Sequence, residues 1–221
     1  MGQEQERGSN SSMETMEAPV NIVFFHMSTS GKQEPVRPLH IGAIDSWGEQ
    51  EFECYVWPEQ ELEEGSDFYT QDGELYRVWH DTPLPCYGLE EALISFVEWL
   101  GEVEGTVVLV AHGCFRDQAR VLLRNLEEFQ ISYDQVISGF TDSRLASEKL
   151  FPLAPDHSLE GMLEHLGLEG EAVHDAVERA EDSRRVCRGL ASHCRMKFLQ
   201  FIIDPDWSCD VHQQWEWAFE T

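Results

Sequence analysis

Two uninterrupted apolar stretches limit the folds open to this chain. NIVFFHM (21–27) and TVVLVAH (106–112) each have the length and the β-branched content of a strand that is buried on both faces. Such strands need helices on both sides of their sheet, and apolar residues recur at helical spacing in 89–103 and 116–129. The sequence therefore predicts an α/β fold, with a mixed sheet flanked by helices.

The other segments extend this pattern. LHIGAIDSW (39–47) and EFECYVWP (51–58) alternate in polarity around Gly48, which predicts a hairpin. Residues 59–88 are acidic and contain several glycines and prolines, so irregular structure is expected there. Further elements are predicted as a strand at 136–143, a helix at 158–168 capped by His157 or Ser158, and a long helix at 174–194.

Charge is distributed very unevenly along the chain. The formal net charge is -27, and residues 49–104 contain 16 acidic residues and one basic residue, Arg77. Nucleic-acid affinity depends on Lys and Arg that neutralise phosphates, so such a surface disfavours nucleic acid for the bare chain. Two readings stay open for the acidic region: a solvated face that favours solubility, or a docking face for a basic protein partner.

Both ends of the chain differ from the middle. Residues 1–19 are polar and predict a disordered lead, and residues 198–221 form an acidic tail rich in tryptophan. The sequence contains neither an apolar run of transmembrane length nor a secretory signal, so we expect no membrane association and an intracellular location, nuclear or cytoplasmic. The six cysteines are expected to be reduced thiols, as in the cytosol or the nucleus.

Several motifs occur together in a recognisable order. They are VFFHMSTSG, LHIGAI, LVAHGCFRDQARVLL, ISGFTDSRLASEKLFP, HSLEGMLEHLGL and VHDAVERAEDSRRV. The series resembles the DEDDh (RNase T-like) 3′–5′ exonuclease family, which implies a ribonuclease H-like mixed sheet of five strands and a domain over 20–197. The ISGFTDS…LFP segment also resembles the exonuclease-type domain of promyelocytic leukaemia protein and its relatives.

The resemblance implies a two-metal phosphodiesterase site. In such a site four carboxylates hold two Mg²⁺ or Mn²⁺ ions, and a histidine acts as general base on the attacking water. Carried onto this chain, the two acids of the first motif fall on His26 and Ser28. The acid of the second motif is kept as Asp117, the general base as His174, and the last acid falls on Arg179.

Three of the four metal-binding carboxylates are therefore replaced in this chain. We expect Arg179 to form a salt bridge with Asp117 in the space that a metal would occupy. The prediction is a catalytically inactive domain without catalytic residues, cofactor or resident metal, which acts as a protein-interaction or scaffold module. Asp142 and Ser143, which resemble a further family motif, are expected to cap a helix.

Two alternatives stay open at this point. One is a 3′–5′ exonuclease with a rearranged Mg²⁺ or Mn²⁺ site built from Asp117, Asp182, His174 and perhaps His26. The other is nucleic-acid binding without cleavage, which requires a basic groove. It depends on the only basic concentration, in which Arg184, Arg185 and Arg188 would contact phosphate or a partner.

Overall fold

A single mixed sheet forms the centre of the molecule. The computed structural model describes residues 20–31, 34–103, 105–168, 175–204 and 207–210. The strand order is β6-β3-β2-β1-β7-β8-β9. The strands are β1 (Val20–Thr29), β2 (Pro38–Asp45), β3 (Glu51–Val56), β6 (Cys86–Tyr87), β7 (Thr106–Ala111), β8 (Ile137–Asp142) and β9 (Ser208–Asp210). The prediction of five strands is thus extended by two short edge strands, β6 and β9.

The strand pairing agrees with the predicted mixed sheet. β1, β2 and β3 pair antiparallel, as the expected hairpin requires, whereas β1, β7 and β8 pair parallel. The parallel strands are joined through helices, because a parallel pair cannot be closed by a tight turn. Since their carboxyl ends lie at one edge of the sheet, the residues that follow β1, β7 and β8 are brought near one another.

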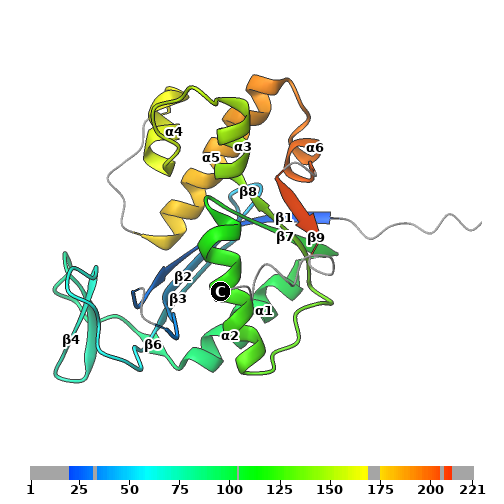
Figure 1. The fold of residues 1–221 in the computed structure, drawn as a ribbon. Coiled ribbons are helices and arrows are strands. Elements are labelled where there is room, and N and C mark those ends of the chain that lie inside the picture. The colour runs from blue at the N-terminus through cyan, green and yellow to red at the C-terminus, as the bar shows by residue number, and fades with distance from the viewer. Residues whose placement is uncertain (1–19, 32–33, 104, 169–174, 205–206, 211–221) are drawn as a thin grey trace, which may run out of the picture.

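Helices cover both faces of this sheet (Figure 1). They are α1 (Leu89–Glu102), the π-helical turn η1 (Cys114–Gln118), α2 (Ala119–Glu128), α3 (Ser143–Leu150), α4 (Leu159–His165), α5 (Ala176–Cys194) and α6 (Phe198–Ile202). Side chains of β1 alternate between two cores: Val23, Phe25 and Met27 pack with α1 and α2, while Ile22 and Phe24 pack with α4, α5 and α6. This three-layer arrangement confirms the predicted α/β fold.

The acidic segment 59–88 contains a hairpin that the sequence analysis missed. Strands β4 (Phe68–Gln71) and β5 (Glu74–Arg77) pair antiparallel around Asp72 and Gly73, both of which have positive φ. An Asp-Gly pair is the preferred two-residue turn of a β-hairpin, and it is visible in the sequence. In Figure 1 this hairpin projects from the body beside β3 and β6.

Part of the segment assigned to the C-terminal tail belongs to the folded unit. Helix α6 buries Phe201 and Ile202, and Trp207 is buried against Phe201. Strand β9 then pairs antiparallel with β8. The boundary predicted at residues 197 and 198 therefore falls inside the domain. The remaining tail, residues 211–221, and the predicted lead, residues 1–19, lie outside the described residues.

None of the described helices combines the length and the apolar character that a membrane span requires.

Candidate functional site at the end of strand β1

The carboxyl-terminal end of β1 opens into a cavity of about 380 Å³. His26 and Ser28 line this cavity together with Arg179 of α5. His26 lies opposite Gly42 in the β1–β2 register. A Cβ atom at Gly42 would come within 2.3 Å of the α5 backbone, so glycine at this position lets the first turn of α5 pack directly on the sheet. The predicted positions of the first and last motif thus meet in one cavity.

The electrostatics of this cavity keep His26 uncharged. Its pKa is lowered to about 3, first by burial and then by the positive charge of Arg179, with smaller contributions from His40 and His112. Because Arg179 already carries a positive charge in this cavity, the imidazole of His26 stays neutral in the folded protein.

This lowered pKa makes stability depend on pH. Below the unfolded-state pKa of 6.5, an unfolded chain binds a proton at His26 that the folded chain does not bind. The free energy of unfolding should therefore fall with decreasing pH, by about 1.4 kcal/mol per pH unit from this residue. His112, whose pKa is also lowered, adds to this slope with the same sign.

Urea unfolding of the wild type and of His26→Gln between pH 6.5 and pH 4.5 measures this contribution. The variant should show the shallower slope, by roughly one proton. Carboxylates with lowered pKa, such as Glu53 at about 2, lose their contribution only below this range. Equal slopes for the two proteins would contradict the account of His26.

Arg179 does not form the predicted salt bridge with Asp117. Its Nη1 lies 3.1 Å from Oε1 of Glu160, at the start of α4. Asp117 lines a different cavity, together with Met27 and Thr29. The prediction was wrong because Asp117 lies in the π-helical turn η1, where the spacing from β7 no longer fixes the direction of a side chain as it would in an α-helix.

The residue next to Asp117 makes the contact with β1. Gln118 is buried, and its Oε1 accepts a hydrogen bond from the backbone N–H of Met27 at 2.6 Å. The Asp117 side chain is exposed. The neutral amide of Gln118, not a carboxylate, thus connects the second motif to the first.

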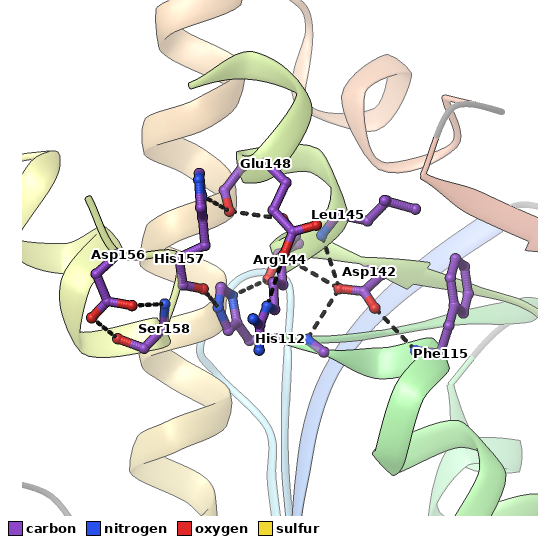
Figure 2. A network of polar contacts seen from close by, with 12 residues as sticks. His112, Phe115, Asp142, Arg144, Leu145, Glu148, Asp156, His157 and Ser158 are labelled. Carbon is purple, nitrogen blue, oxygen red and sulfur yellow. Dashed lines mark hydrogen bonds and ion pairs between the residues drawn. The ribbon is translucent and has the colours of Figure 1, made fainter. Parts of the chain in front are cut away.

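Asp142 has the structural role that was predicted for it. It is the N-cap of α3 and accepts hydrogen bonds from the backbone N–H groups of Arg144 and Leu145. It also accepts bonds from the N–H groups of Gly113 and Phe115, both 3.0 Å away. Figure 2 shows the carboxylate at the centre of these contacts. One side chain therefore holds the starts of η1 and α3 together.

His112 is held in the same network. Its Nδ1 lies 3.0 Å from Oγ of Ser143, and its Nε2 lies 2.7 Å from the carbonyl oxygen of His157, to which it donates (Figure 2). Both ring nitrogens are therefore engaged by the protein itself. Of the two predicted caps of α4, His157 and Ser158, the cap is Ser158, whose Oγ accepts a hydrogen bond from the N–H of Gly161.

Asp182 and the basic cluster of α5 have partners within the chain. Asp182 pairs with Arg185 at 2.8 Å and lines a cavity away from Asp117. Arg184 pairs with Glu181, and both Arg184 and Arg188 donate to the carbonyl oxygen of Ser46 in the β2–β3 turn. Arg184 and Arg188 thus hold that turn against α5. His174, the predicted general base, lies outside the described residues.

A buried ionic network that the sequence analysis did not find lies beside the cavity. Arg77 of β5 is 6% exposed, and its Nη1 lies 3.1 Å from Oδ2 of Asp175, the N-cap of α5. Its Nη2 donates to Nδ1 of His40, also at 3.1 Å. Nε2 of His40 therefore carries the proton and donates to Oε1 of Glu53. Arg77 thus links the β4–β5 hairpin to β2, β3 and α5.

The same network contains the one group of potential metal ligands in the described part of the chain. Ligand atoms of His40, Glu53 and Asp175 lie within 4.8 Å of one another. The guanidinium of Arg77 is bonded to two of these three residues, and it also lies over the ring of Tyr55. The positive charge that a metal would supply is thus provided by the protein.

An acidic loop closes over the end of β1. Glu63, Glu64 and Asp67 line the same cavity as His26. A Cβ atom at Gly31 would come within 2.1 Å of the Glu63 carboxyl group, so the loop lies directly against the chain that follows β1. Gln60 holds this loop in place through hydrogen bonds to Oγ of Ser30 and to the carbonyl oxygen of Pro35. The wall that this loop contributes to the cavity is therefore negatively charged.

Comparison with known proteins gives structural neighbours only. No family model and no curated protein matches this chain. Exonuclease I superposes with a TM-score of 0.58 at 13% identity, over 79% of this chain and 41% of its own. The nuclease domain of 3′hExo, a DEDDh family member solved with rAMP, gives 0.54 at 15% identity, over 80% of this chain and 94% of its own. The 3′-exonuclease in a structure of 3′-end recognition of the histone mRNA stem-loop has a TM-score of 0.57 at 13% identity, over 86% of this chain and 70% of its own.

The chain spans well under half the length of exonuclease I, so that enzyme is matched only in part. Identities of 13–15% carry information on the fold alone. The chain thus has the α/β ribonuclease H-like fold of the DEDDh 3′-exonucleases.

Proposed function

We propose that this chain is a catalytically inactive exonuclease-like domain that acts as a protein-interaction module. The main support for this proposal is the cavity at the end of β1, which is lined by His26, Ser28 and Arg179. Mg²⁺ and Mn²⁺ prefer carboxylate oxygens, and a guanidinium repels them. The three motif positions supply no carboxylate. Glu63, Glu64 and Asp67 line the same cavity, but among the described residues they form no group of ligand atoms close enough to share a metal ion.

The alternative of a rearranged exonuclease site has weaker support. The structural neighbours are 3′-exonucleases, which favours it. Its two acids, however, line separate cavities, Asp117 beside α2 and Asp182 beside Arg185. A two-metal centre needs its carboxylates around ions roughly 3.5–4 Å apart.

Nucleic-acid binding without cleavage is also less well supported. Arg184, Arg185 and Arg188 are engaged with acids or with the Ser46 carbonyl. The acidic loop that lines the cavity would repel a phosphate backbone. Localisation in the nucleus or cytoplasm, and the narrower relation to the exonuclease-type domain of promyelocytic leukaemia protein, belong to the same proposal and depend on the sequence motifs.

The segment 57–88 is the surface that we assign to the protein partner. It combines the acidic loop with a set of exposed large apolar side chains: Trp57, Tyr69, Val78, Trp79 and Tyr87. Exposed aromatic residues among acids suit a basic partner, since Arg and Lys form ion pairs and also lie over aromatic rings. A partner segment rich in arginine fits this chemistry.

Binding of an arginine-rich peptide tests this assignment. Fluorescence anisotropy of a labelled peptide of about 15 residues should give weaker binding, by at least about tenfold, for Glu63→Gln/Glu64→Gln/Asp67→Asn than for the wild type. The matched control Glu90→Gln/Glu91→Gln/Glu98→Gln removes the same charge from α1. Equal losses in the two variants would show attraction by net charge only and would contradict a docking surface at 57–88.

A further inference from the structure

A second cavity, beside the first turns of α2, is lined by several arginines. It has a volume of about 600 Å³ and lies between η1, α2 and the segment that follows β1. Four arginines line it: Arg37, Arg116, Arg120 and Arg124. The whole chain has only 15 Lys and Arg residues against 42 acids, so four in one cavity is a local reversal of the protein's charge.

Helical spacing explains why these arginines converge. Arg120 and Arg124 are four residues apart on α2, and residues at this spacing lie on one face of an α-helix. Arg116 joins them from the preceding turn η1. Arg37 enters from the opposite wall. The cavity thus receives guanidinium groups from two separate parts of the chain.

Two of the four arginines are already neutralised. Arg37 forms a two-pronged ion pair with Glu128, at 2.6 and 2.7 Å. Arg124 pairs with Glu34 at 2.9 Å. These pairs fix the walls of the cavity and leave no net charge.

The other two arginines have no acidic partner among the described residues. Neither Arg116 nor Arg120 takes part in an ion pair there, and Nε of Arg120 is buried without a hydrogen-bond acceptor. Asp117 is the remaining acid of the lining. Arg116 is exposed and Arg120 is half-buried, so their guanidinium groups add positive charge to the cavity without an acid to neutralise it. Charge-assisted hydrogen bonds to an anion would satisfy such groups.

We propose that this cavity binds a phosphate monoester through Arg116 and Arg120. The planar guanidinium presents paired N–H donors that match phosphate oxygens. The volume lies in the range of small-molecule sites, and Met27, Pro35, Val36 and Val121 offer apolar contacts for the rest of the ligand. The protein's charge of -27 repels long polyanions, so a single compact phosphate group is the favoured ligand.

Isothermal titration of the full chain tests the site with three probes: inorganic phosphate, adenosine 5′-monophosphate and N-acetyl-O-phosphotyrosine amide. Saturable binding of at least one is expected, with no binding of adenosine or N-acetyltyrosine amide. Tighter binding of the nucleotide than of phosphate would identify a free metabolite as the source. Tighter binding of the phosphotyrosine amide would identify a phosphorylated protein. Equal binding of all three would still support the anion site.

Variants locate the site. Arg116→Gln/Arg120→Gln should weaken binding at least about tenfold, whereas the control Arg144→Gln/Arg195→Gln, which removes the same charge elsewhere, should change it less than about twofold. Val36→Phe keeps both arginines but fills the cavity, so it should weaken the two organic phosphates more than inorganic phosphate. Absence of saturable binding by the folded wild type up to about 10 mM, or equal losses in both double variants, would overturn the proposal.

Discussion

Replacing Arg77 with methionine should lower the free energy of unfolding by about 3–5 kcal/mol. The side chain is buried, and it bonds to Asp175 and His40 while lying over Tyr55. Its removal leaves the Asp175 carboxylate in a partly buried position without its cation. It also releases the β4–β5 hairpin from β2 and α5. Urea unfolding at pH 7 measures the loss.

Two comparisons make the Arg77 result specific. Arg144→Met removes an exposed arginine whose partner, Glu148, lies one helical turn away, and it should cost less than about 0.5 kcal/mol. In Arg77→Met/Asp175→Asn the uncompensated charge is absent, so the double variant should be less destabilised than the sum of the two single changes. A loss below about 1 kcal/mol for Arg77→Met would contradict a structural role for the network.

Replacing Asp142 with alanine should cost about 2–4 kcal/mol of unfolding free energy. The carboxylate accepts four backbone N–H bonds, two at the start of α3 and two from Gly113 and Phe115. Loss of an N-cap costs about 1 kcal/mol, and buried N–H groups without acceptors add to it. Thermal or urea unfolding of the variant gives the value.

Asp142→Asn and Asp134→Ala provide the controls for this prediction. The asparagine retains a carbonyl oxygen that can accept these bonds, so it should recover part of the lost stability. Asp134 is exposed and accepts a hydrogen bond from the hydroxyl of the exposed Ser132, so its replacement should change stability by less than about 0.5 kcal/mol. Equal effects for Asp142→Ala and Asp134→Ala would show that Asp142 does not join η1 to α3.

Much of the fold is readable from local patterns in the sequence. The buried strands 21–27 and 106–112 and the apolar spacing of 89–103 identify the sheet and the helix that crosses it, because burial imposes these patterns directly. The β4–β5 hairpin was missed although Asp72-Gly73 signals its turn. Its strands are short, and acidic residues conceal their alternation. The length of the sheet was also underestimated, since β9 depends on pairing with β8 rather than on its own composition.

The site was harder to predict, because its contacts join distant segments. Arg77 looks in the sequence like a single base in an acidic region, yet its partners come from β2 and from the start of α5. The direction of the Asp117 side chain depends on the π-helical turn η1, and no residue pattern in the sequence predicts that turn. The ion pair of Arg179 with Glu160 likewise depends on the packing of α4 against α5.

The most direct test of the central claim is degradation of 3′-labelled single-stranded DNA and RNA, in Mg²⁺ and in Mn²⁺, by the wild type and by Asp117→Ala. A DEDDh exonuclease in the same buffers provides the positive control. We expect no cleavage above background from either protein, because under the proposed function His26, Ser28 and Arg179, which line the cavity, replace the metal-binding acids. Cleavage by the wild type that Asp117→Ala abolishes would mean that the chain is an active exonuclease with a rebuilt site, contrary to the proposed function.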